Sequence, residues 1–181
     1  MIAKVYSSEG IVLAKRDYGE ADRILVLFTK HFGKVSALAK GVKKLKSKKR
    51  GHLEIFSLIR FQAAKGKGLD IVTEAETIDN FGVIRKDLKK SSVAYFFCEV
   101  VGKLTKEEER NEELFEFLYG YLRRLKKTSS LKKFRNKFTK ELLVLLGFWP
   151  RGKGLENPDM FLESVAERQF SSIRVGKKVL S

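Results

Sequence analysis

The residues best suited to do chemistry in this chain form a short basic segment, residues 40–50 (KGVKKLKSKKR), with seven cationic side chains and no anionic one. The cations are Lys40, Lys43, Lys44, Lys46, Lys48, Lys49 and Arg50. Mutual repulsion at this density is tolerated in a solvated loop or against phosphate groups, so the segment predicts a binding site for a polyanion. A loop that only keeps the chain in solution is the alternative.

The overall charge favours nucleic acid as the polyanion. The 181 residues include 38 Lys and Arg against 22 Asp and Glu, a formal net charge of +16. A chain this basic attracts a phosphate backbone. An anionic membrane surface is the competing target, but no apolar stretch reaches the roughly 18 residues of a spanning helix. Residues 1–10 also lack the apolar core of a signal peptide, so we expect a cytoplasmic protein that does not act at a membrane.

Signatures of catalysis and metal binding are absent from the sequence. It contains no phosphate loop, dinucleotide-binding, zinc-protease or serine-hydrolase motif. The single cysteine, Cys98, lies in an apolar run typical of a core, and His31 and His52 lack the spacing of metal ligands. The acids of residues 107–116 point in different directions around a helix, which argues against paired catalytic carboxylates. We therefore expect a binding protein, not an enzyme, with no cofactor and no metal.

The first part of the chain has the pattern of strands. Runs rich in β-branched or aromatic residues, separated by turn-forming residues, lie at 10–16, 23–29, 34–40, 52–63 and 69–78. Five short strands fit a small barrel, of which the OB-fold is the commonest nucleic-acid-binding example. Tyr18 and Phe32 lie in turns and are candidates for stacking on bases, whereas Phe56 and Phe61 are more typical of a barrel core.

From residue 82 the apolar residues recur at three- and four-residue steps, which predicts helices. One helix is expected at 91–104 and a second after Thr105, with that threonine as N-cap and Glu108 three residues later. A third is expected at 131–146 between a Ser130 cap and Gly147, and a shorter one at 159–173. The predicted fold class is therefore α+β, with a five-stranded OB-fold barrel at residues 1–79 and a helical domain at residues 80–181.

The helix expected at 131–146 carries a basic face beside apolar residues. Lys133, Lys137 and Lys140 recur at helical spacing next to Phe134, Phe138 and Val144. An apolar slot with a charged rim suits a peptide tail that ends in acids and an aromatic residue. The alternative is an ordinary amphipathic helix whose phenylalanines are core and whose lysines are solvated.

Several motifs follow one another in the order and spacing of the bacterial recombination mediator family RecO. They are G-I-V-L at 10–13, Y-G-E-A-D at 18–22, I-L-x-L-F-T at 24–29, G-K-V at 33–35, A-K-G at 39–41 and F-x-x-E-L-L-x-L-L-G-F-x-P at 138–150. The resemblance covers most of the chain and implies an N-terminal OB-fold and a helical C-terminal domain. The sequence departs from the family in one respect, because many members carry a four-cysteine zinc site after the last motif. Here RGKGLENPDMF follows, without cysteine.

The resemblance also implies a function. Members of this family bind single- and double-stranded DNA, anneal complementary strands and work with RecR. They help RecA replace single-strand-binding protein on gapped DNA without hydrolysing a nucleotide. On this basis we expect residues 40–50 to contact DNA together with Arg16, Arg23, Lys34 and Tyr18, and the tail of single-strand-binding protein to be the natural occupant of the slot at 131–146. An RNA-binding or ribosome-associated OB-fold protein and a protein-interaction adaptor for an acidic peptide remain open alternatives.

Overall fold

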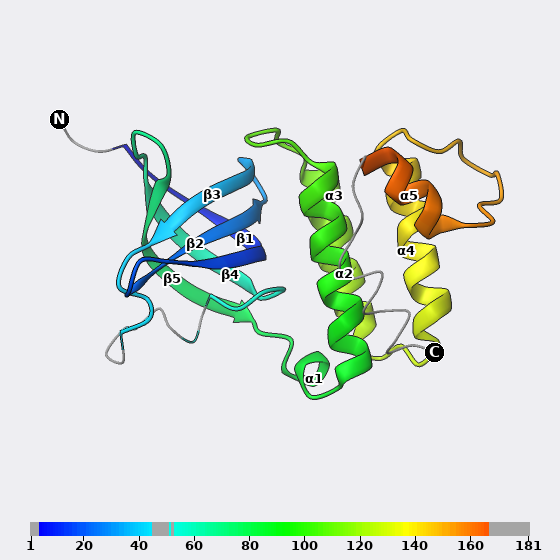
Figure 1. The fold of residues 1–181 in the computed structure, drawn as a ribbon, viewed down its shortest axis with the longest axis horizontal. Coiled ribbons are helices and arrows are strands. Elements are labelled where there is room, and N and C mark those ends of the chain that lie inside the picture. The colour runs from blue at the N-terminus through cyan, green and yellow to red at the C-terminus, as the bar shows by residue number, and fades with distance from the viewer. Residues whose placement is uncertain (1–3, 45–50, 52, 167–181) are drawn as a thin grey trace.

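A computed structural model describes residues 4–44, 51 and 53–166 of the chain, in which a barrel of strands precedes a group of helices (Figure 1). The strands are β1 (Val5–Tyr18), β2 (Asp22–Thr29), β3 (Gly33–Ala39), β4 (Leu58–Ala64) and β5 (Asp70–Asp79). The helices are α1 (Gly82–Arg85), α2 (Leu88–Leu104), α3 (Glu112–Leu125), α4 (Leu131–Leu145) and α5 (Pro158–Ala166). The predicted α+β class is confirmed.

The strands close into a barrel in the order β1-β2-β3-β5-β4, and β4 pairs back with β1. Neighbouring strands are antiparallel except β3 and β5, which run parallel and pair at Ala37 with Asp70 and at Leu38 with Ile71. This is the five-stranded Greek-key barrel of the OB-fold, as predicted. The strand expected at 52–63 begins later than predicted because Phe56 has a φ of 55°, a left-handed conformation that an extended strand does not allow.

Apolar side chains of the barrel belong to two cores. The barrel interior contains Val12 of β1 together with Leu25, Leu27, Ile59, Phe61 and Val72. Ile11 and Leu13, the neighbours of Val12 in sequence, belong to the core of the helices. Successive side chains on a strand point to opposite faces, so residues 11–13 of β1 are buried on both faces of the sheet. The barrel and the helices therefore share a core.

Helix α2 is the central element of this shared core. It packs against β1 on one side and against α3 and α4 on the other (Figure 1). Phe97 of α2 stacks on Phe138 of α4, with ring centroids 3.9 Å apart, and Tyr121 of α3 packs edge-on against both rings. Cys98, the next residue of α2, is fully buried, as predicted, and burial raises the pKa of its thiol to about 12.

Helix α3 begins later than the sequence predicts. Its N-cap is Asn111, whose side chain accepts a backbone hydrogen bond from the first turn, whereas Thr105 stands at the end of α2. Residues 105–110 form a loop held against the barrel, where the N–H of Glu108 donates to the main-chain oxygen of Lys34 at 2.8 Å. The expectation of a helix starting after Thr105 was wrong because this contact with β3 holds the segment outside the helix.

The last two helices follow the sequence pattern more closely. Gly147 has a φ of +79° just past the end of α4, as expected of a helix terminator. Ser130 occupies the N-cap position without a side-chain hydrogen bond. Helix α5 is joined to α4 by an ion pair of 2.8 Å between Arg135 and Asp159, and the remainder of the predicted helix, residues 167–173, lies outside the described residues.

Candidate nucleic-acid interface

Residues 40–44, the part of the basic segment that the structure describes, are anchored to the turn between β1 and β2. Gly41 has a φ of +65°, a conformation that favours glycine, and its N–H donates to Asp22 Oδ1 at 2.7 Å. The N–H of Lys43 then donates to the main-chain oxygen of Ala21 at 2.9 Å. These bonds bring the segment and the turn together, so their basic side chains form one surface.

Within the basic segment, the lysines differ in exposure. Lys40 and Lys44 are exposed to solvent. Lys43 is partly buried, and its ammonium lies 3.1 Å from Asp17 Oδ2. The other predicted contacts of this segment lie outside the described residues: Lys46, Lys48, Lys49 and Arg50.

The strand ends beside the β1–β2 turn add three of the predicted contacts. Arg16 is exposed, and Tyr18 is 55% exposed. Arg23 is less available, because its Nε donates to Asp17 Oδ1 at 3.0 Å. Hydrogen bonds from Arg23 and then Lys43 hold the pKa of the Asp17 carboxyl below its ordinary value. Asp17 therefore stays anionic at neutral pH and orients two cations of the surface.

Lys34 has a different environment from the other predicted DNA contacts. Its side chain is only 13% exposed, and its ammonium donates to the main-chain oxygens of Gly102 at 2.9 Å and Thr105 at 2.5 Å. These oxygens belong to the C-terminal end of α2, where carbonyls lack helical partners and attract positive charge. Lys34 thus caps α2, and this placement argues against the predicted contact with DNA.

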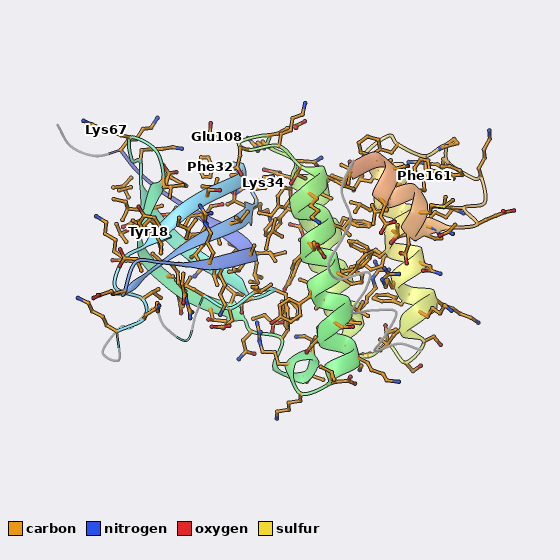
Figure 2. All side chains as sticks on the ribbon, viewed as in Figure 1. Tyr18, Phe32, Lys34, Lys67, Glu108 and Phe161 are labelled. Atoms are coloured by element: carbon orange, nitrogen blue, oxygen red, sulfur yellow. The ribbon has the colours of Figure 1, made fainter. Side chains whose placement is uncertain are left out.

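The β4–β5 turn contributes a cation that sequence reasoning missed. Residues 65–68 (KGKG) form this turn, and Lys67 is exposed on it. In OB-folds the loops between strands 1 and 2 and between strands 4 and 5 border the nucleic-acid-binding face. Figure 2 shows Tyr18 and Lys67 on the part of the barrel away from the helices. The position of the KGKG turn within an OB-fold is the signal that would have identified Lys67.

The aromatic side chains divide by exposure. Phe61 is 2% exposed and fills the barrel, and Phe56 is 1% exposed and belongs to the core shared with the helices. Phe32, in the β2–β3 turn, is 38% exposed. Tyr18 and Phe32 are therefore accessible for stacking, as their position in turns predicted, whereas Phe56 and Phe61 are not.

The predicted peptide slot on α4 has a different lining from the one expected. Phe138 is fully buried, and Phe134 packs against the same core, so these two rings belong to the interior of the helical region. A cavity of about 530 Å³ does lie farther along the helix, lined by Phe117, Lys137, Lys140, Glu141, Val144, Leu145, Arg151 and Gly152. Lys133 is not part of it and lines a separate hollow at the start of α4.

Two further features of the described residues bear on the site. Over residues 4–44, 51 and 53–166, no group of three or more His, Cys, Asp or Glu side chains is arranged to hold a metal ion. No helix in that part of the chain is long and apolar enough to cross a membrane.

Comparison with known proteins connects this architecture to a family. Residues 1–81 match the family model for the recombination protein O N terminal region, and residues 85–153 match the model for its C terminal region. The first match covers all five strands, and the second covers α2, α3 and α4. The matches follow one another in the order that the sequence motifs predicted.

Similar full-length proteins carry the name DNA repair protein RecO. The one from Dehalococcoides mccartyi (strain 195) is 37% identical over 145 residues, which are 80% of this chain and 57% of that protein. The one from Roseiflexus sp. (strain RS-1) is 34% identical over 148 residues, 82% of this chain and 52% of that protein. The one from Pelotomaculum thermopropionicum is 37% identical over 147 residues, with shares of 81% and 57%. The chain spans about half the length of the curated relatives it matches, and it belongs to the RecO family.

Proposed function

We propose that this chain binds DNA through the basic surface of its barrel and acts as a non-catalytic mediator of recombinational repair. The observation that carries the proposal is the anchoring of the segment at 40–50 beside the β1–β2 turn of an OB-fold. Lys40 and Lys44 thereby join Arg16 and Tyr18 on a single loop surface. Loops in this position hold nucleic acids in other OB-folds.

The proposed mode of binding is electrostatic. Lysine and arginine side chains neutralise phosphates and release their counterions, which favours binding to any DNA sequence. Because phosphates occur on both forms of DNA, single strands and duplexes are both ligands of this surface. Neutralising phosphates on two strands lowers the repulsion that opposes their pairing, so the same surface promotes annealing. Tyr18 adds an exposed ring on which an unpaired base can stack.

Family membership supports the cellular role in this proposal, since the relatives are named as DNA repair proteins. In that role the chain works with RecR and helps RecA replace single-strand-binding protein on gapped DNA. We infer that residues 1–79 form the DNA-binding domain and that residues 80–181 carry partner contacts. No step of this role requires a cofactor or a metal ion.

A second function, the docking of an acidic peptide tail, is favoured by the cavity on α4. Three cations, Lys137, Lys140 and Arg151, line this cavity with one acid, Glu141, and with apolar side chains that include Phe117 and Val144. A tail ending in acids and an aromatic residue, such as that of single-strand-binding protein, matches this combination of charge and apolar surface. The docking site proposed here therefore keeps Lys137, Lys140 and Val144 of the residues expected from the sequence and does not include Phe134 and Phe138.

Fluorescence anisotropy with labelled DNA tests the DNA-binding function. Single strands of unrelated sequences should bind with similar affinity to one another, as should duplexes of unrelated sequences, and binding of both forms should weaken steeply with salt. If ~5 phosphates of a single strand are neutralised, the slope of log affinity against log salt should be about −3.5. RNA of the same length is the competitor that addresses the ribosome-associated alternative. A slope near zero, a strong preference among unrelated sequences, or tighter binding of RNA than of DNA would overturn the proposal.

A further inference from the structure

A cleft on the barrel lies between the β2–β3 turn, the start of β1, the end of β4 and the α2–α3 loop. Its volume is about 340 Å³, within the range of small-ligand sites. Its lining residues are Lys4, Tyr6, His31, Phe32, Val35, Lys65, Glu108 and Arg110. Figure 2 shows Phe32 and Glu108 toward the helices, whereas Tyr18 lies on the other side of the barrel. The cleft is therefore separate from the surface formed by Lys40, Lys44, Arg16 and Tyr18.

Two aromatic rings supply the apolar part of the cleft. The ring centroids of Tyr6 and Phe32 are 4.7 Å apart. The Tyr6 hydroxyl donates to the buried carboxylate of Asp70 at 2.6 Å, which fixes this ring against the barrel. Phe32, in contrast, is 38% exposed. An exposed ring backed by a fixed one is a suitable platform for another flat apolar group.

The backbone on both sides of the cleft is held in place. The buried hydroxyl of Thr29 donates to the main-chain oxygen of Gly33 at 2.8 Å and accepts from the N–H of Phe32 at 3.0 Å. On the opposite side, the N–H of Glu108 donates to the main-chain oxygen of Lys34 at 2.8 Å. A cleft fixed in this way loses little conformational entropy when a ligand enters.

The charges around the rings favour an anionic group. Lys4, Lys65 and Arg110 line the cleft together with one acid, Glu108. Lys65 is less available, because its ammonium lies 3.1 Å from the buried carboxylate of Asp70 and 3.3 Å from Glu108. Arg110 lies 2.5 Å from Glu112 outside the lining. This exposed ion pair contributes little, so a phosphate can compete for Arg110 and bind beside Lys4. A phosphate beside a flat ring is the chemistry of a nucleotide.

We propose that this cleft receives an unpaired base of single-stranded DNA, stacked on Phe32, with the adjoining phosphate beside Lys4 and Arg110. The inference rests on the proposed DNA binding and adds a second point of contact to it. Strand β2 has eight residues and spans about 25 Å between the turn at Tyr18 and the turn at Phe32. A single strand held at the basic surface therefore has to run along the barrel to reach the cleft. A duplex keeps its bases stacked and paired, so it cannot fill this site.

The test compares Phe32→Leu and Phe32→Tyr in the full chain. Leucine keeps an apolar side chain at the site but removes the aromatic face, whereas tyrosine keeps the ring. Phe32→Leu should weaken single-stranded DNA binding about tenfold, the effect of losing one stacked base. Phe32→Tyr should retain the wild-type affinity, and neither variant should change duplex affinity. Glu108→Gln, which removes the anion from the lining, should tighten single-strand binding.

A spectroscopic readout makes the test independent of affinity. In a Phe32→Trp variant, single-stranded DNA should quench the added tryptophan fluorescence, with the wild-type signal of Trp149 as background, and duplex should not. Equal loss of single-strand and duplex binding in Phe32→Leu would indicate a structural role and overturn the inference. Unchanged single-strand affinity, or quenching by an acidic peptide but not by DNA, would overturn it as well.

These outcomes separate the cleft from the proposed function. Wild-type binding of both DNA forms without any effect of the Phe32 substitutions rejects only the cleft. Failure of the wild-type chain to bind either form rejects the DNA-binding function and the cleft together.

Discussion

Gly33 of β3 lies directly against Glu109 in the α2–α3 loop, so that a β-carbon on Gly33 would stand 2.2 Å from the main-chain oxygen of Glu109. Gly33 also has a φ of +68°, a conformation that strains any other residue. The barrel thus receives the loop at a position where only glycine fits. The same loop carries Glu108 and Arg110 to the edge of the proposed base-binding cleft.

This close approach predicts a large effect of Gly33→Ala on stability. Gly19 is a matched control, since its φ is +59° but nothing lies within 4 Å of an added β-carbon. Gly19→Ala should cost about 1 kcal/mol of unfolding free energy from backbone strain alone. Gly33→Ala should cost about 2–4 kcal/mol, because the loop must also move. Urea unfolding, monitored by circular dichroism, measures the unfolding free energy of both variants. Equal losses in Gly19→Ala and Gly33→Ala would mean that the loop moves aside at no cost in free energy.

The cap on α2 gives a second prediction. Lys34→Met removes two hydrogen bonds from a charged donor and leaves the oxygens of Gly102 and Thr105 without this partner, so it should lower the unfolding free energy by about 2–4 kcal/mol. Lys30→Met is the control, because it breaks only the solvent-accessible pair with Glu116 and should change stability little. Denaturant unfolding compares the two. DNA affinity of the folded Lys34→Met protein should equal that of the wild type, and a loss would restore Lys34 as a DNA contact.

The sequence predicted the barrel well because its signal is local. Alternating apolar residues and glycine-containing turns mark each strand of an OB-fold independently of the rest of the chain. The failures are positions where distant contacts decide the local structure. Phe56 is not extended as a strand residue would be, and its side chain packs in the core shared with the helices. Residues 105–110 have the charge pattern of a helix start, but a backbone hydrogen bond to Lys34 of β3 holds them as a loop.

The candidate site was predictable in position but not in detail. The charge of residues 40–50 predicted a basic surface without any structural information, and DNA binding by this surface stays a prediction. Sequence cannot show that Asp17 engages Lys43 and Arg23, because those partners meet only when the turn and the segment fold together. For the same reason, helical spacing on α4 could not distinguish Phe138, which faces the core, from residues that line the neighbouring cavity.

The buried thiol of Cys98 predicts a pH dependence of stability. Burial raises its pKa from 9.0 to about 12, so in this range the folded state holds a proton that the unfolded state releases. The contribution is complete below pH 9 and is lost as the pH rises toward 12. The unfolding free energy of the wild type should therefore fall more steeply than that of Cys98→Ala, by up to about 1.4 kcal/mol per pH unit. Urea titrations between pH 8 and pH 11 measure the difference, and parallel curves would contradict it.

The basic segment should contribute strongly to DNA binding and little to stability. Replacing Lys43, Lys44, Lys46, Lys48, Lys49 and Arg50 by Gln should abolish most affinity while the melting temperature changes little, because removing like charges relieves repulsion. A matched control lowers the net charge equally on the helical region, by replacing Lys127, Lys132, Lys133, Lys137, Arg151 and Lys153 with Gln. Anisotropy titrations should show the larger loss in the first variant. A larger loss in the control would move the main DNA site to the helices.

The cavity on α4 predicts which lysines hold an acidic tail. Lys137→Glu combined with Lys140→Glu reverses two charges at the cavity and should weaken a labelled peptide ending in acids and an aromatic residue by about tenfold or more. Lys132→Glu combined with Lys133→Glu makes the same charge change on the same helix but at the separate hollow, so it should have little effect. The full chain is required, because Ile11 and Leu13 of the barrel complete the core of the helices. Equal loss in the two variants would reduce the interaction to general attraction by the basic helix, and no binding by the wild type would remove the docking site altogether.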